Sequence, residues 1–167
     1  MGSVLRLLTA ATTIVLAGCS RGSESSPEKA AGRLQPDGVT PTLTRSARPT
    51  RYNLERINNV IDPTANQPVL LSASDDLIVM GWAVDKVAKN IPAAVELAID
   101  GNAYQAIAGL DRPDVAEFFK TPAYAKAGFQ FTAPVAWLGK GKHELKLRIV
   151  YRDGTYFEAP PVELWVR

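Results

Sequence analysis

The stretch HELKLRIVYRDG, residues 143–154, decides the fold because its side chains alternate in character. One set is apolar or aromatic and begins with the single histidine of the chain: His143, Leu145, Leu147, Ile149 and Tyr151. The other set is charged: Glu144, Lys146, Arg148 and Arg152. A period of two places one set on each face of a β-strand, so one face is predicted to lie in a core and the other in water. Asp153 and Gly154 then predict a tight turn into the returning strand TYFEA.

Further strands are predicted on both sides of this hairpin. DLIVMGWAVD, residues 76–85, contains a continuous apolar run, and AAVELAIDG, residues 93–101, alternates with period two before a turn. GFQFTAPV and the final VELWV show the same alternation. Residues 109–128 break the pattern, and Pro113 at a helical first turn predicts a short helical crossover there. The sequence therefore predicts an all-β antiparallel sandwich of about seven strands over residues 67–167.

The series GWAVD, VELAIDG, DRPDV, GFQF and LGKGKHELKLRIVYRDG resembles bacterial immunoglobulin-like β-sandwich modules. Such modules occur on cell-surface proteins and beside carbohydrate-active domains. The resemblance implies an immunoglobulin-like fold and a module that binds or spaces rather than catalyses. It implies no particular binding residue.

The N-terminal residues predict where in the cell the protein is located. Arg6 precedes an apolar run over residues 7–17, which is shorter than the roughly 20 residues that cross a bilayer. The run ends in LAGC, residues 16–19, which resembles the lipobox of bacterial lipoproteins. The resemblance implies that residues 1–18 are a signal peptide and that Cys19 carries diacylglycerol and an N-acyl chain, which anchor the protein in a membrane. The alternative is a buried free cysteine in an N-terminal helix.

The lipoprotein resemblance also implies a location in the bacterial cell envelope. Ser20 follows the cysteine where an aspartate commonly retains lipoproteins in the inner membrane, so the outer membrane is favoured in a Gram-negative source. Residues 19–51 are rich in Ser, Pro, Thr and Arg and predict a disordered tether. Within residues 52–66, Leu54, Ile57 and Ile61 fall at helical spacing and predict a short amphipathic helix or linker. That helix would either cover one end of the domain or face a membrane or partner.

Charge and cysteine content exclude several classes. The chain has 19 Lys and Arg against 17 Asp and Glu, and removal of Arg6 with the signal peptide leaves a net charge of +1 (18 against 17). This balance argues against nucleic acid as a partner. The single cysteine, if lipidated, leaves no disulfide and no cysteine-based metal site, so no metal or cofactor is predicted.

Catalysis is not expected, because histidine, the commonest general base, occurs only once in the chain. That histidine lies on the strand face predicted to point into the core. His143 is therefore predicted to be structural. The alternative function is an envelope carbohydrate-active hydrolase that uses a carboxylate pair, either Asp75 with Asp76 or Asp111 with Asp114. Turn and helix-capping roles explain both pairs without catalysis.

Three residues are predicted to bind a ligand. Trp137 lies in a loop, and Trp165 is out of phase with its apolar neighbours, so both are candidates for stacking on a sugar. Arg112 stands between Asp111 and Asp114 and is a candidate for binding a polar group of a ligand. Alternatively, it forms an ion pair with a neighbouring acid and orders its loop. The predicted function is a lipid-anchored, non-catalytic binding or adaptor module for an envelope protein or cell-wall glycan.

Overall fold

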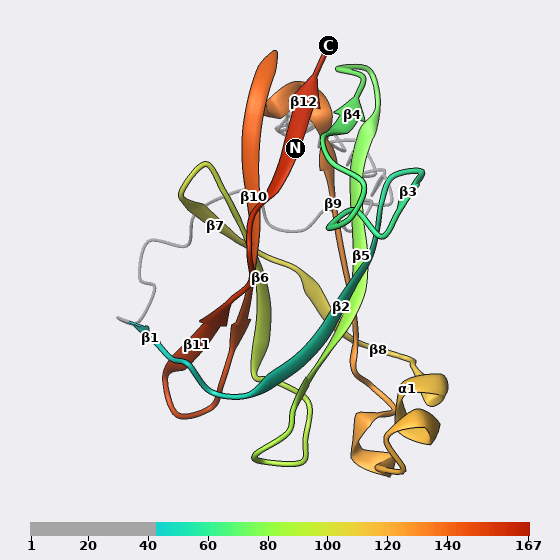
Figure 1. Ribbon diagram of the computed structural model, residues 1–167, viewed down its shortest axis with the longest axis vertical. Helices are drawn as coiled ribbons and strands as arrows, with labels where there is room; N and C mark the ends of the chain where they lie inside the picture. Colours follow the sequence, from blue (N-terminus) through green and yellow to red (C-terminus); the bar gives the residue numbers. More distant parts are fainter. Residues whose placement is uncertain (1–42) are drawn as a thin grey trace, which may run out of the picture.

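The computed structural model describes residues 43–167 and contains two β-sheets packed face to face (Figure 1). The predicted signal peptide, Cys19 and most of the predicted tether lie outside the described residues. The first sheet has seven strands: β1 Thr44–Arg45, β4 Val69–Leu71, β6 Ala94–Ile99, β7 Asn102–Gln105, β10 Gly141–Val150, β11 Thr155–Glu158 and β12 Val162–Val166. The second has five: β2 Thr50–Ile57, β3 Val60–Ile61, β5 Asp76–Asp85, β8 Ile107–Leu110 and β9 Gly128–Pro134. The predicted all-β sandwich is confirmed.

Strand β10, which contains the alternating stretch of the sequence, organises the first sheet. It pairs antiparallel with β6 on one side. On the other side its N-terminal half pairs with β12 and its C-terminal half with β11, both antiparallel. Two parallel pairings, β4 with β12 and β1 with β11, extend the sheet at its edges. The predicted hairpin between β10 and β11 is present.

The second sheet is antiparallel in the order β3, β2, β5, β9, β8. Its inward residues meet those of the first sheet in one core, whose largest fully buried side chains are Phe129, Phe131, Ile57, Leu77, Leu97, Ile99, Leu145, Leu147, Ile149 and Leu164. Burial of each such side chain contributes about 1.5–3 kcal/mol. Gly81 in β5 allows close packing here, because a Cβ atom would lie 2.1 Å from the carbonyl oxygen of Asn53 and 2.8 Å from the ring of Phe129.

The prediction of a short helix in residues 52–66 is wrong. The segment forms most of β2, followed by β3 and a turn region. Strand β2 pairs with β5, but its register shifts between Leu54 and Arg56. This bulge inserts one residue, so Leu54 and Ile57, three positions apart, both face the core. Their helical spacing is therefore the signature of a bulged strand.

The predicted C-terminal boundary of the tether, at residue 51, is also wrong, because residues 44–51 belong to the sandwich. Strand β1 pairs parallel with β11, and β2 begins at Thr50. Between them, Arg48 forms ion pairs with Asp85 and Asp153. The sandwich thus includes residues more than 20 positions before the predicted boundary at residue 67, as the bounds of β1 show.

The predicted helical crossover is present as α1 Pro113–Phe118 and a 3-10 turn, η1 Pro122–Tyr124. Pro113 occupies the first turn, but the N-cap is Arg112 and no side chain caps the helix. Val115 is buried, whereas Phe118 is 79% exposed. Within residues 43–167, no helix has the length and apolar character needed to cross a bilayer.

Candidate functional site

His143 is held in a hydrogen-bonded structural position. It lies in β10 and is buried, with its Nδ1 2.6 Å from Oδ2 of Asp100 and its Nε2 3.2 Å from the carbonyl oxygen of Gly139. The other oxygen of Asp100 accepts the backbone N–H of Glu144 at 2.9 Å. Partial burial raises the pKa of Asp100, but the hydrogen bonds from Glu144 and His143 outweigh this effect and lower it from its usual value. Both ring nitrogens of His143 are therefore occupied.

Trp137 packs on the end of the sandwich. It ends the 3-10 turn η2, Val135–Trp137, and its ring meets Tyr104 edge-on with centroids 4.5 Å apart. Tyr104 in turn contacts the core residue Phe131. The indole is 36% exposed and lines a shallow pocket with Asp100 and Tyr104. Much of the ring is thus committed to closing the core.

Trp165 stands on the outward face of the first sheet. It is 43% exposed and lies in register with Lys142 of β10 and Leu70 of β4, which is 50% exposed. Its Nε1 donates to Oε1 of Glu163 at 2.6 Å, and the other oxygen of Glu163 pairs with Lys142. Hydrogen bonds from Lys142 and Trp165 lower the pKa of Glu163. The indole is therefore oriented by a charged partner while a large part of its surface remains accessible.

Arg112 connects two distant segments. Its guanidinium makes two hydrogen bonds to Glu55 of β2, at 2.9 and 2.8 Å, and two to Asp114, at 2.9 and 2.6 Å. The hydrogen bonds from Arg112 lower the pKa of Asp114 to about 2. The geometry favours the interpretation that Arg112 orders its loop. Its second partner, Glu55, was not indicated by the sequence. A ligand at Arg112 stays a prediction.

The carboxylate pairs considered for catalysis are divided among different partners. Asp111 pairs with Lys126 at 2.8 Å, whereas Asp114 pairs with Arg112. Asp75 precedes β5, and its carbonyl oxygen accepts the N–H of Val135. Among residues 43–167, no group of three or more His, Cys, Asp or Glu side chains is arranged to hold a metal ion.

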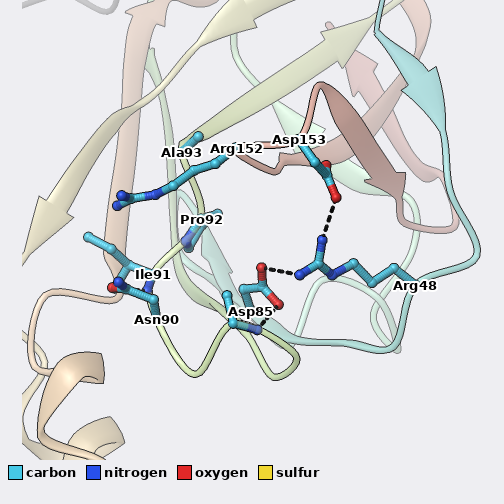
Figure 2. A pocket seen from close by; sticks show the side chains of 9 residues that line it. Arg48, Asp85, Asn90, Ile91, Pro92, Ala93, Arg152 and Asp153 are labelled. Atoms are coloured by element: carbon cyan, nitrogen blue, oxygen red, sulfur yellow. Dashed lines mark hydrogen bonds and ion pairs between the residues drawn. The ribbon is translucent and has the colours of Figure 1, made fainter.

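A pocket of about 180 Å³ with four charged residues in its lining lies where the loop of residues 86–93 meets the β10–β11 turn (Figure 2). Arg48 forms one side of it, with its Nη2 2.8 Å from Oδ2 of Asp85 and its Nη1 2.7 Å from Oδ2 of Asp153. The same guanidinium lies 4.6 Å from the ring centroid of Tyr151. Arg152 forms another side of the pocket.

Sequence reasoning missed this pocket. Arg48 fell in the predicted tether, Asp85 at the end of an apolar strand, and Arg152 beside a predicted turn. Arg48 and Asp85 are 37 positions apart, so no local spacing joins them. The one usable signal is Arg152, since a charged residue at a hairpin turn is placed to project from the end of a sandwich.

Fold and surface together define a β-sandwich with an oriented surface tryptophan and a separate pocket lined by charged residues. No family model matches the sequence, and no curated protein or solved structure matches it significantly.

Proposed function

We propose that the protein is a lipid-anchored envelope module whose sandwich binds a cell-wall glycan without catalysing a reaction. The observation that carries the proposal is Trp165, an exposed indole on a sheet face with its N–H fixed by Glu163. Fixing the ring before binding reduces the ordering cost that a ligand would otherwise have to offset.

The surroundings of Trp165 suit a sugar better than a purely apolar partner. Leu70 extends the apolar surface, while Lys142, Glu163 and Glu144 supply charged donors and acceptors on the same face, as the strand register requires. A sugar ring combines an apolar face of C–H groups with a rim of hydroxyls, and this pattern complements an indole flanked by polar groups.

The N-terminal sequence supports the anchoring part of the proposal. LAGC at residues 16–19 provides the acceptor cysteine, and residues 20–42 have the polar, proline-containing composition expected of a tether. A module tethered in this way would sample nearby cell wall while remaining at the membrane, with the outer membrane favoured by Ser20 in a Gram-negative source.

The test is binding of the full chain, purified in detergent, to insoluble peptidoglycan by co-sedimentation. Trp165→Ala is expected to weaken binding by about twofold to thirteenfold, since aromatic stacking contributes about 0.5–1.5 kcal/mol. Trp137→Ala is the matched control, because its indole is already engaged with Tyr104. Equal binding by the wild type and Trp165→Ala would overturn the assignment.

Crosslinking in intact cells decides between glycan and protein as the partner. Capture of a protein through the face around Trp165, without binding to glycan, would replace the glycan with an adaptor function. The hydrolase alternative receives no support from Asp111 and Asp114, since each is held in a different ion pair.

A further inference from the structure

The two carboxylates that line the pocket beside Arg48 are both engaged in hydrogen bonds within the protein. Asp85 accepts two backbone N–H groups of the 86–93 loop through Oδ1, at 2.9 and 3.0 Å, and Arg48 through Oδ2. Asp153 accepts the N–H and hydroxyl of Thr155 through Oδ1, at 3.0 and 2.7 Å, and Arg48 through Oδ2. Each of the four oxygens thus has a partner, and each acid already accepts three hydrogen bonds within the protein.

Arg152 and Asn90 supply free side-chain donors to the pocket. Arg152 forms no ion pair or hydrogen bond with another side chain in the part of the chain that the structure describes, and Figure 2 shows its guanidinium extending away from Arg48 toward Asn90 and Ile91. The Oδ1 of Asn90 accepts the N–H of Ile91 at 2.8 Å, so its amide nitrogen is left as a donor. Pro92 and Ala93 add an apolar wall.

The lining of the pocket is balanced in charge, with two arginines and two aspartates, and the loop beside it adds two lysines. Four basic residues, Arg48, Lys86, Lys89 and Arg152, lie in the three segments that form it, against two acidic residues, Asp85 and Asp153. Lys86 and Lys89 are exposed and belong to the same loop as Asn90. The volume of about 180 Å³ is far above the roughly 10–15 Å³ that holds one water, which leaves room for a carboxylate and the atoms attached to it.

We propose that this pocket binds a carboxylate group, such as that of a peptide C-terminus or an acidic sugar, with the guanidinium of Arg152 as its main donor. A guanidinium presents two parallel N–H groups that match the two oxygens of a carboxylate. The pocket is separate from the proposed glycan surface, because Lys142 beside Trp165 lies near the start of β10 and Arg152 follows its end. Ten residues of strand place them about 30 Å apart.

The test is titration of the ¹⁵N-labelled full chain in detergent, followed by NMR of the Arg152 Nε–Hε group and the backbone amides of residues 86–93. The probes are N-acetylalanine against its C-terminal amide, and glucuronate against glucose, with sodium chloride as an ionic-strength control. We expect saturable shifts with at least one carboxylate and none with its neutral partner. A response to N-acetylalanine alone identifies a peptide source, and a response to glucuronate alone an acidic sugar.

Three variants complete the test. Arg152→Gln is expected to weaken carboxylate binding by about tenfold to a hundredfold, and Arg152→Lys to weaken it less, since the charge remains without the fork. Arg167→Gln, which makes the same change of charge at the end of the chain, should leave binding unchanged. Absence of saturation with both carboxylates, equal shifts with the neutral probes or with chloride, or unchanged binding in Arg152→Gln would each overturn the proposal.

Discussion

At the scale of single residues, the burial of His143 could be predicted from the alternation of residues along its strand, but its hydrogen-bond partner could not. Alternation along residues 143–151 places it with the inward residues, and it is buried in the structure. The partner that satisfies it could not be read from the sequence, since Asp100 lies 43 positions away in the β6–β7 turn. Asp100 reaches both His143 and the backbone of β10 because β6 pairs with β10. The pairing of strands therefore decides the chemistry of this residue.

The depressed pKa of Asp100 predicts a pH dependence of stability. Because this pKa is lowered from 3.8 on folding, the ionised carboxyl stabilises the protein above that value, and the stabilisation is lost as pH falls below it. Asp100→Asn should therefore have a lower free energy of unfolding than the wild type at pH 6, and the difference should shrink as pH falls below about 4. Urea denaturation at a series of pH values measures it.

The control for this prediction is Asp111→Asn, which removes an exposed ion pair with Lys126 and is expected to change stability little at pH 6. A difference between Asp100→Asn and the wild type that stays constant from pH 6 to pH 3 would contradict the proposed role of the carboxylate.

At the scale of elements, β2 shows where pattern recognition fails. Leu54 and Ile57 mimic helical spacing because a bulge shifts the register, and bulges arise from pairing with a neighbour, here β5. Strand β1 is missed for a related reason. Its side chains are exposed, so its order comes from backbone pairing with β11 and from the nearby ion pairs of Arg48, which composition does not reveal. By contrast, β10 and β6 were predictable because their burial pattern is regular.

The placement of β2 predicts where a stable domain must begin. A chain that starts at residue 67 lacks β1 to β3, exposes the edge of β5 and loses Leu54 and Ile57 from the core. Loss of two buried aliphatic side chains alone costs about 3–6 kcal/mol, which approaches the total stability of many domains. We expect the chain starting at residue 43 to unfold cooperatively and the shorter one to aggregate or lack a cooperative transition, as followed by circular dichroism on heating.

The cooperativity of thermal unfolding distinguishes the chain starting at residue 43 from the chain starting at residue 67. A sharp unfolding transition of the chain starting at residue 67, with a midpoint within a few degrees of that of the longer chain, would show that β2 is dispensable and that the sandwich core lies elsewhere.

At the scale of the whole molecule, the proposals assign different tasks to different parts. The N-terminal segment is proposed to anchor the protein, the outward face of the first sheet to bind glycan, and the pocket at the far end of β10 to hold a carboxylate. The sandwich separates the two binding surfaces by the length of its longest strands, so both can be occupied at once.

The anchoring proposal predicts the behaviour of Cys19→Ala. Without the thiol, no diacylglycerol can be attached, so the variant should lose incorporation of radiolabelled fatty acid and leave the lipidated membrane pool as unprocessed precursor or soluble protein. Ser20→Ala, beside it, should retain labelling. Unchanged fatty-acid labelling of Cys19→Ala would refute lipidation at this residue.

The sequence by itself determined the all-β class and the strands whose two faces lie in different environments, because burial on one face imposes a period of two on the residues. It also carried the lipobox pattern, which is a local signal of four residues, 16–19. Only the tertiary structure decided the bulge in β2, the pairing of β1, the ion pairs of Arg48 and Arg112, and the donors left free around Arg152. These features depend on residues far apart in the chain, and their partners become neighbours only when the two sheets form.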